Sequence, residues 1–368
     1  MPTAEYARDR LLAALRPPLS GADYCVSLAA SLGRYWSALL HPLASGGRTV
    51  AVVGALPKAD YYDPHGLGRL PLELPRVTFS LRPPRRIAST TLLTDDLTGE
   101  LAQRPWNKVL QVSVATETML ADAGPHYRMP FPIFPGYAAR GWEPRFVAQR
   151  DSVRTTKVLF AGNTDRALYD ERTPQETRRL HGYQLSRCAA LDVLRGELAA
   201  ADLVVAESEA ELGRAYDGSC AGRALVAGWS GYRDEEWIRV LGATDFFLAL
   251  PGVFMPMSHN IIEALAAGCV PITSYPRWLS PALIDGTNCL VYDDAASLVR
   301  ALRRALEMGP ADVERMRSAA ADYYDSHLAP GVVASRLAGL PGGATVYVQT
   351  ENSKQTALIQ RGSVGFPG

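Results

Sequence analysis

The chain alternates short, continuous apolar runs with longer amphipathic segments. Apolar runs of four to seven residues are typical of buried strands in a parallel sheet. They fall at 49–53, 77–81, 108–114, 157–161, 202–206, 223–227, 245–250 and 269–272. Apolar residues spaced for one face of a helix occur at 22–44, 184–200, 234–241, 259–267, 295–309 and 311–327. The alternation of the two patterns predicts an α/β protein.

The length of the chain and one segment rich in Pro and Gly predict two domains. A chain of 368 residues suits two domains of ordinary size. Residues 124–146 are rich in Pro and Gly, which places a domain boundary there. We therefore predict an N-terminal domain over 1–145, a second domain over 146–325, and a C-terminal helix and tail over 326–368.

Three further segments are less regular. Residues 57–76 and 82–90 are rich in Pro, Gly and Arg and are predicted to be loops. From Gly342 the composition becomes polar, and Val346-Tyr347-Val348 fits a strand. For this tail a strand, an added hairpin, a disordered segment and a partner-binding segment all stay open.

Composition excludes several classes of protein. Lys plus Arg and Asp plus Glu both number 38, so bulk charge does not favour nucleic acid as a partner. The five cysteines are scattered without zinc-ligand spacing, which predicts reduced core thiols and a cytoplasmic protein. No signal peptide and no run of about 18 apolar residues is found, so no membrane span is expected. Association with a membrane surface stays open.

The segment 254–272 carries the strongest chemical signal. Ser258 is predicted to be the N-cap of a short helix, and Gly268 to end that helix in the left-handed conformation. A helix N-terminus binds phosphate through its free N–H groups. His259, Asn260 and Glu263 stand beside it, which together favour a nucleotide ligand.

This segment resembles the donor-site signature of GT-B glycosyltransferases. Two branches of that family match it: the retaining branch and, as well or better, the exostosin-like branch. The matching residues are Pro256, Met257, Ser258, His259, Glu263, Ala264, Leu265, Ala266, Gly268, Cys269 and Pro271. The retaining pattern has a Glu where this chain has Met255. The resemblance implies a GT-B fold, with two Rossmann-like domains facing one another across a cleft.

The resemblance also implies roles for individual residues. Glu263 would bind the hydroxyls of the nucleotide ribose, while Ser258, His259 and Asn260 would meet the diphosphate. A second group, Gly162, Asn163 and Arg166, follows the strand at 157–161, at the strand edge where ligands bind in open α/β sheets. Arg166 would neutralise the leaving diphosphate, and Arg187 on the next helix is a competing candidate.

The group that acts on the acceptor is less clear from sequence. Met255 lacks the carboxylate that contacts the donor sugar in retaining relatives, so retention and inversion both stay open. Inversion needs a general base, which we place at Asp63 or His65 in the turn Asp63-Pro64-His65-Gly66. Weaker candidates are Asp23, Asp60, Glu117 and His126. No Asp-x-Asp metal motif occurs, and neither a metal nor a cofactor is predicted.

The sequence thus predicts an enzyme that transfers a sugar from a nucleotide-diphosphate sugar donor to an acceptor hydroxyl. The acceptor is a small molecule, a glycan or a glycolipid. Two alternatives stay open: a catalytically silent nucleotide-sugar-binding protein, and a GT-B-fold epimerase.

Overall fold

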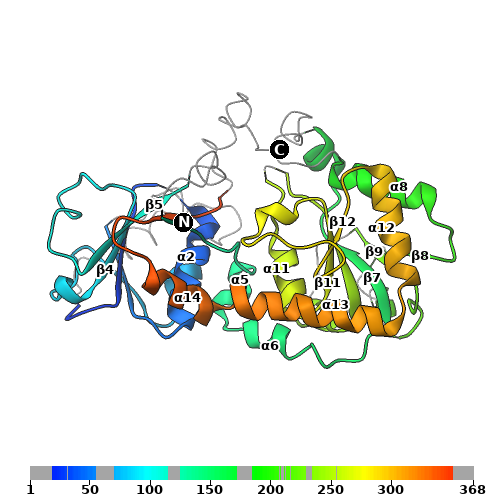
Figure 1. The fold of residues 1–368 in the computed structure, drawn as a ribbon, viewed down its shortest axis with the longest axis horizontal. Coiled ribbons are helices and arrows are strands. Elements are labelled where there is room, and N and C mark those ends of the chain that lie inside the picture. The colour runs from blue at the N-terminus through cyan, green and yellow to red at the C-terminus, as the bar shows by residue number, and fades with distance from the viewer. Residues whose placement is uncertain are drawn as a thin grey trace. The chain divides into compact units, whose positions relative to one another are not determined.

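The chain forms two compact units, and unit 1 is built from two separate segments of the sequence (Figure 1). Of the described residues, unit 1 contains those up to Trp142 and those from Leu328 onward, and unit 2 contains those from Glu143 to His327. The computed structural model describes residues 19–30, 32–54, 70–114, 125–171, 185–206, 208, 211, 213–215, 217–228, 234–253 and 255–350. The two catalytic candidates, Asp63 and His65, lie outside these residues, as do Asp60 and Glu117.

Unit 1 is built on a seven-stranded sheet in which every strand pair is parallel. The strand order is β3-β2-β1-β4-β5-β13-β6. The strands are β1 (Tyr24–Ser27), β2 (Val50–Val53), β3 (Val77–Ser80), β4 (Thr91–Thr94), β5 (Lys108–Ser113), β6 (His126–Arg128) and β13 (Thr345–Tyr347). Its helices are α2 (Trp36–Ser45), α5 (Pro135–Ala139) and α14 (Pro330–Gly339), with single turns at Gly33–Tyr35, Leu70–Glu73 and Ile87–Ser89.

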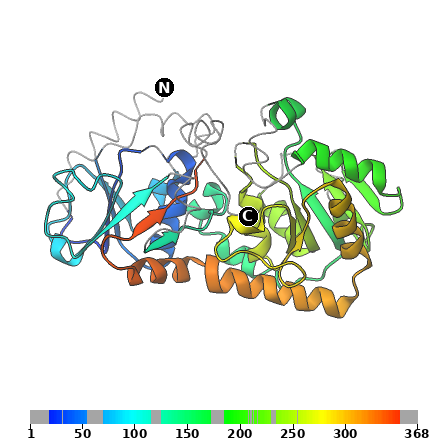
Figure 2. The ribbon, with the colours of Figure 1, turned by 45° about the horizontal axis from the view of Figure 1, so that its top comes forward.

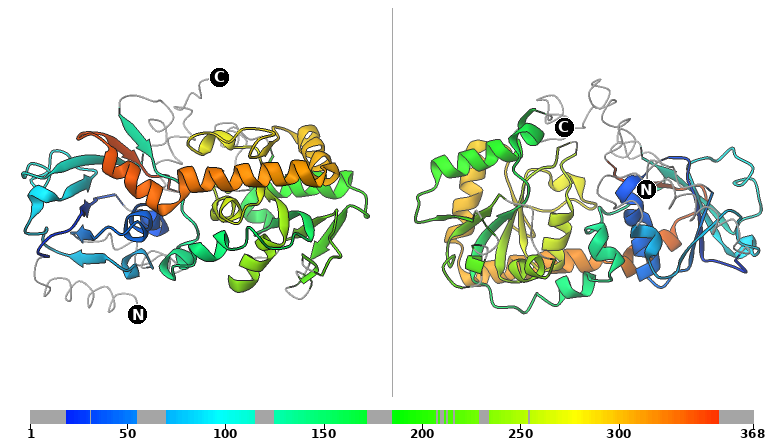
Figure 3. Two further views of the ribbon diagram at one scale, coloured as in Figure 1. Left: turned by 60° about the horizontal axis from the view of Figure 1, so that its bottom comes forward. Right: turned by 180° about the vertical axis from the view of Figure 1, so that it is seen from behind.

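The end of the chain completes the unit 1 sheet. Strand β13 lies between β5 and β6 and pairs with both in parallel (Figure 2, orange-red). Helix α14, which precedes it, packs against α2 (Figure 3). The predicted strand at Val346–Val348 is therefore confirmed, as Thr345–Tyr347, and its neighbours come from residues more than 200 positions earlier. The alternatives for the rest of the tail concern residues 351–368, which lie outside the described residues.

The predicted helix over 22–44 is wrong in its first part. Tyr24–Ser27 is the interior strand β1, and the helix starts only at Trp36. The helical spacing of apolar residues in 22–35 arises because β1 is buried on both faces and Leu28, Leu32 and Tyr35 after it are buried as well. Strand β4 had no counterpart among the sequence predictions either.

Unit 2 is a second parallel α/β domain, so the predicted class of two Rossmann-like domains is confirmed. Its sheet has the order β12-β11-β10-β7-β9-β8. The strands are β7 (Thr156–Ala161), β8 (Leu203–Ala206), β9 (Ala224–Ala227), β10 (Thr244–Ala249), β11 (Val270–Thr273) and β12 (Leu290–Val291). The helices are α6 (Glu143–Val147), α8 (Arg187–Glu197), α10 (Asp234–Gly242), α11 (His259–Ala266), α12 (Ala295–Glu307) and α13 (Pro310–Tyr323). Single turns lie at Ala167–Glu171, Gly213–Ala215, Pro276–Trp278 and Tyr324–Leu328.

Helices cover both faces of the unit 2 sheet. Phe246 and Leu248 point into a core shared with α8 and α12. Phe247, which lies between them on β10, points the other way and meets the ring of Trp237 on α10. Helix α11 packs on this second face against α6 and α13. The alternation along β10 thus fixes a doubly wound sheet.

Two further predictions concern the cysteines and the membrane. All five cysteines are buried and free, as predicted. Within the described part of the chain, no helix is both long enough and apolar enough to cross a membrane.

The chain segments that enter and leave unit 2 are joined by a buried hydrogen bond. Glu143 is the first residue of unit 2, and Tyr324 lies in the turn at which the chain leaves it. The hydroxyl of Tyr324 donates to Oε1 of Glu143. Burial raises the pKa of Glu143 to about 7, and the bond from Tyr324 opposes that rise.

Because of this carboxyl group, we expect the free energy of unfolding to fall as pH rises. The pKa of Glu143 is higher in the folded than in the unfolded protein, so the folded state binds the extra proton between pH 4.5 and about 7. Ionisation of Glu143 therefore lowers the free energy of unfolding by up to about 3 kcal/mol as pH rises through that window. We expect Glu143→Gln to raise the melting temperature at pH 8 more than at pH 5. The exposed Glu235, paired with Arg145, is the control: Glu235→Gln should leave the pH profile unchanged, and an equal effect of both variants would contradict the assignment.

Candidate functional site

The switch point of the unit 2 sheet lies between β7 and β10. From β7 the chain leaves to α8 on one face, and from β10 it leaves to α11 on the other. The two connections diverge at the carboxyl ends of the strands, which is where ligands bind in open α/β sheets. Both groups of residues that the sequence selected meet here.

The turn after β7 is stabilised by the side chain of Asn163, one of its own residues. Oδ1 of Asn163 accepts the backbone N–H of Asp165 at 2.8 Å. The carbonyl oxygen of Asn163 accepts a hydrogen bond from Arg187 at 3.0 Å. A Cβ atom at Gly162 would lie 3.4 Å from the same guanidinium. Gly162 and Asn163 therefore border Arg187, and Asn163 itself is exposed.

The structure favours Arg187 over Arg166 as the cation of the site. Arg166 is 59% exposed and pairs with Asp192 of α8 at 2.6 Å, away from the strand end. The first cause of the low pKa of Asp192 is that bond from Arg166. Arg166 already has an anion, so the role predicted for it fits Arg187 better.

Arg187 is a buried cation without a carboxylate partner among the described residues. It begins α8 and is 8% exposed. Its guanidinium donates to the carbonyl of Asn163 and to the hydroxyl of Tyr169, and lies 4.1 Å from the centre of the Tyr169 ring. Its Nε has no hydrogen-bond partner within the described part of the chain. A buried cation held only by neutral groups is stabilised by an anionic ligand.

The start of α11 lies at the same strand end. Nδ2 of Asn260 donates to the carbonyl of Ala161, the last residue of β7, at 3.1 Å. This bond brings the two predicted groups of residues together, and it commits the Asn260 amide to the scaffold. Ser258 is the N-cap by position, but its hydroxyl accepts no helix N–H, so the predicted capping bond is absent. His259 is the first helical residue and is half-buried.

Glu263 is more deeply placed than its predicted role suggests. The residue is 1% exposed, and its Oε2 accepts the indole N–H of Trp237 at 2.7 Å. The bond fixes the orientation of the carboxylate. A ribose diol would have to reach a side chain that the domain almost completely covers.

Tyr275 is a site residue that sequence reasoning missed. It follows β11 at the same sheet edge and is 1% exposed. Its backbone N–H donates to Oγ1 of Thr273 at 3.3 Å. Burial raises the pKa of Tyr275 to about 12, against the opposing charge of Arg187. No motif marks this residue, because its position depends on which strands are neighbours.

The loop between β10 and α11 folds on itself. A Cβ atom at Gly252 would lie 2.5 Å from the carbonyl oxygen of Met255. The N–H of Gly252 donates to the carbonyl of Pro256. The fold of the loop itself therefore requires glycine at position 252. The close approach of a ligand is not needed to explain it. Met255, at the position of the retaining Glu, is a buried apolar side chain.

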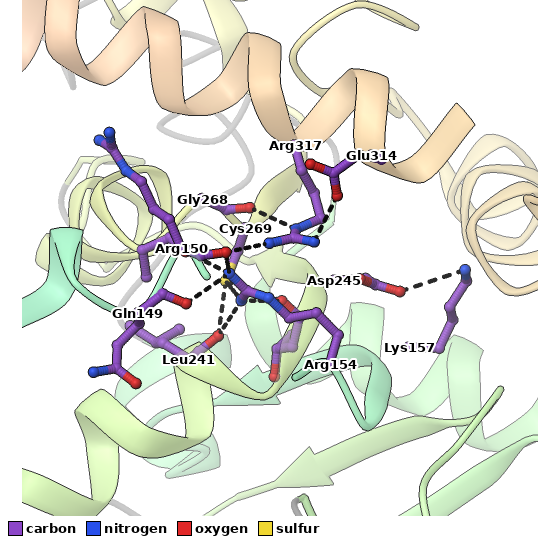
Figure 4. A network of polar contacts seen from close by, with 12 residues as sticks. Gln149, Arg150, Arg154, Lys157, Leu241, Asp245, Gly268, Cys269, Glu314 and Arg317 are labelled. Atoms are coloured by element: carbon purple, nitrogen blue, oxygen red, sulfur yellow. Dashed lines mark hydrogen bonds and ion pairs between the residues drawn. The ribbon is translucent and has the colours of Figure 1, made fainter. Parts of the chain in front are cut away.

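The other end of α11 is anchored by a half-buried arginine. Gly268 has φ +73°, and the N–H groups of Gly268 and Cys269 donate to the carbonyls of Leu265 and Ala264, which is the predicted left-handed helix end. Arg154 donates to the carbonyl of Ala267 at 2.8 Å (Figure 4). The motif therefore places a fixed helix with its N-terminus toward the switch point.

Comparisons with known proteins give likenesses of structure only. No protein-family model and no curated protein sequence matches this chain. A crystal structure of HepE from Anabaena in complex with UDP is similar, with 10% identity and TM-score 0.43, over 86% of this chain and 98% of that one. A glycosyltransferase from Rickettsia africae has 8% identity and TM-score 0.37, over 86% and 96%. AviGT4, a glycosyltransferase involved in avilamycin A biosynthesis, has 13% identity and TM-score 0.38, over 86% and 96%.

Proposed function

We propose that this chain is a glycosyltransferase whose unit 2 binds a nucleotide-diphosphate sugar. The observation that carries the proposal is Arg187, a buried cation beside the switch point that lacks a carboxylate partner among the described residues. The N-terminus of α11 adds a second source of positive potential at that edge. The donor-site motif supplies both α11 and the strand that follows it.

Glycosyl transfer requires a site that stabilises the departing diphosphate. In glycosyl transfer the bond between C1 of the sugar and the diphosphate oxygen breaks, and its electron pair stays on that oxygen. A bond forms between C1 and the acceptor oxygen, whose proton passes to a base. Arg187 and the N–H groups of α11 would stabilise the charge that develops on the diphosphate. We therefore propose a reaction that needs no metal ion.

The other predicted roles are carried forward on the motif. Ser258 and His259 stand at the start of α11, where a diphosphate would lie, with Gly162 and Asn163 across the switch point. Glu263 stays the proposed ribose ligand. Asp63 or His65 of unit 1 stays the proposed base toward a small-molecule, glycan or glycolipid acceptor. The proposed compartment is the cytoplasm.

A silent nucleotide-sugar-binding protein is the second candidate. The observation in its favour is Met255, a buried thioether where retaining relatives carry a carboxylate. Such a protein would keep the diphosphate site and lack turnover. The Arg187 site therefore serves both candidates, and only a measurement of turnover separates them.

The test of function is release of nucleoside diphosphate. The protein is incubated with UDP-, GDP-, ADP- and dTDP-sugars and a panel of hydroxyl acceptors, and free nucleoside diphosphate is measured. Acceptor-dependent release supports the transferase. Donor binding without release supports the silent binder, while a new sugar epimer without acceptor indicates an epimerase. If neither binding nor release occurs with any of the four donors, the proposal is wrong.

Removal of the buried cation should weaken diphosphate binding strongly. A charge-assisted hydrogen bond contributes about 1.5–3 kcal/mol, which corresponds to roughly a 10- to 150-fold change in affinity. We expect Arg187→Met to weaken nucleoside-diphosphate affinity by that factor, and to leave affinity for the free nucleoside unchanged, as measured by calorimetry. Arg166→Met is the matched control, because Arg166 is paired with Asp192. Equal losses in both variants would contradict the assignment of the diphosphate to Arg187.

A further inference from the structure

The sheet of unit 1 has a switch point of its own, between β1 and β4. From β1 the chain runs to β2 on one side, and from β4 it runs to β5 on the other. Ser27 and Thr94, the last residues of the two strands, are paired in register. The residues that follow them therefore meet at the carboxyl edge of the sheet, where open α/β domains bind their ligands.

A carboxylate of the chain itself fills the turn after β1. The two oxygens of Asp95, which follows β4, accept the backbone N–H of Ala29 at 2.9 and 3.0 Å. Oδ2 of Asp95 also accepts the N–H of Ala30 at 2.7 Å. Successive backbone N–H groups that converge in a turn form a binding place for an anion. In unit 1 the anion that occupies this place is Asp95.

The switch points of the two units therefore differ in charge. In unit 2, Arg187 borders the strand end and has no carboxylate partner among the described residues. In unit 1, the N–H groups that could hold an anion are already bound to a carboxylate. A phosphate group would have to displace Asp95 from these donors and then lie beside its negative charge. Like charges repel, so this edge of unit 1 disfavours a phosphate group.

A hydroxyl group meets no such barrier. An ionised carboxylate offers about four lone pairs, and the bonds from Ala29 and Ala30 do not use all of them. The side chain of Asp95 is half-buried, so part of it stays open to solvent. It can therefore accept a further hydrogen bond from a hydroxyl group, which brings no charge to the edge.

We propose that Asp95 selects the acceptor: the edge of unit 1 takes a group with neutral hydroxyls and excludes a phosphorylated one. The inference rests on the proposed function, because it assigns the acceptor to unit 1. It narrows the acceptor to neutral polyols, sugars and glycans at this position. Asp95 acts by occupying the two N–H donors, and the proposed base stays Asp63 or His65.

Removal of the carboxylate should turn the turn after β1 into a phosphate site. Inorganic phosphate is titrated into the whole chain, and the amide resonances of Ala29 and Ala30 are followed by NMR. We expect both resonances to shift with phosphate in Asp95→Ala, and not in the wild type at the same concentrations. The apparent affinity of this turn for phosphate should rise at least about tenfold. The readout is local, so phosphate bound in unit 2 does not disturb it.

Asp96→Ala is the matched control. Asp96 is the next residue, but its Oδ1 accepts the N–H groups of Thr98 and Gly99 in its own turn. This variant should leave the two amides after β1 unresponsive to phosphate. Asp95→Asn is the second test variant, because it keeps the size of the side chain if the alanine variant does not fold. Its loss of charge alone should make the two amides respond.

The acceptor assay supplies a second measurement. Each hydroxyl acceptor that supports release of nucleoside diphosphate in the wild type is compared with its phosphate ester. The wild type should use the neutral acceptor, and Asp95→Ala should lower the ratio of kcat/KM values for the neutral and phosphorylated forms at least about tenfold. Asp96→Ala should leave this ratio unchanged.

Three results would overturn the inference. The first is a phosphate-dependent shift of the Ala29 and Ala30 amides in the wild type. The second is the absence of such shifts in a folded Asp95 variant. The third is a wild type that uses the phosphate ester as well as the neutral acceptor. If no donor releases nucleoside diphosphate, the proposed function fails, while the phosphate titration, which needs no donor, still decides whether Asp95 closes this turn to anions.

Discussion

A chain that ends after Pro341 is expected to lose the fold of unit 1. Such a chain lacks β13, whose backbone bonds run to β5 on one side and β6 on the other. It also lacks the buried side chains of Val346, Tyr347 and Val348. Burial of three such side chains contributes about 5–8 kcal/mol, comparable to the whole stability of a typical domain. The loss should therefore unfold unit 1 rather than weaken it slightly.

Hydrogen exchange measures this outcome strand by strand. In the chain ending at Pro341 the amides of β5 and β6 should exchange rapidly, while those of β7 and β10 in unit 2 stay protected. A chain that ends after Thr350 keeps β13 and is the control, with wild-type protection expected in both units. Protected β5 amides in the shorter chain would show that unit 1 does not need its last strand.

Replacement of Arg154 by methionine is the second large effect. Its guanidinium donates to the carbonyls of Leu241, Thr244 and Ala267 at 2.8 Å each, and to those of Gln149 and Arg150 (Figure 4). Two of these carbonyls end α10 and α11, where the helix dipoles are negative. Methionine keeps the length of the stem and removes all of these hydrogen bonds. We expect a loss of about 3–5 kcal/mol in the free energy of unfolding.

Urea unfolding checks this value against an exposed arginine. Arg145 forms a surface ion pair with Glu235, and surface pairs contribute about 0–1 kcal/mol. Arg145→Met should therefore shift the unfolding midpoint only slightly. A similar shift for both variants would mean that the Arg154 carbonyls find water or other donors once the guanidinium is gone.

The sequence predicted unit 2 better than unit 1, for a physical reason. In unit 2 every strand except the two-residue β12 overlaps a predicted apolar run, and each long helix is amphipathic, so local pattern and final fold agree. In unit 1 strand β1 carries apolar spacing that also fits a helix, and β4 reads Thr-Leu-Leu-Thr. The apolar run at Val346–Val348 fits a strand, but the position of β13 between β5 and β6 depends on partners far away in the chain. No local pattern contains that information.

In the candidate site, too, the residues defined by local sequence were predicted, and those that depend on the assembled fold were not. The Ser258 N-cap position and the Gly268 helix end follow from local chemistry, and both positions were predicted correctly. The choice between Arg166 and Arg187 depends on Asp192, a turn further along α8, which removes Arg166 by pairing with it. Tyr275 enters the site only because β11 lies beside β10. The ion pair of Arg166 and the position of Tyr275 are both properties of the assembled domain, so local sequence does not reveal them.

The position of β13 also bears on how the protein is made. Synthesis proceeds from the N-terminus, so β1 to β6 leave the ribosome before unit 2 is made, while their missing neighbour β13 follows more than 200 residues after β6. Unit 2 has its whole described sheet by Val291, well before β13. The nascent chain must therefore carry β5 and β6 with unpaired strand edges while all of unit 2 is synthesised, and such edges are sites of aggregation. Of the two described units, unit 1 begins first and is completed last, and the yield of folded protein should depend on how well those two edges are shielded until β13 has been translated.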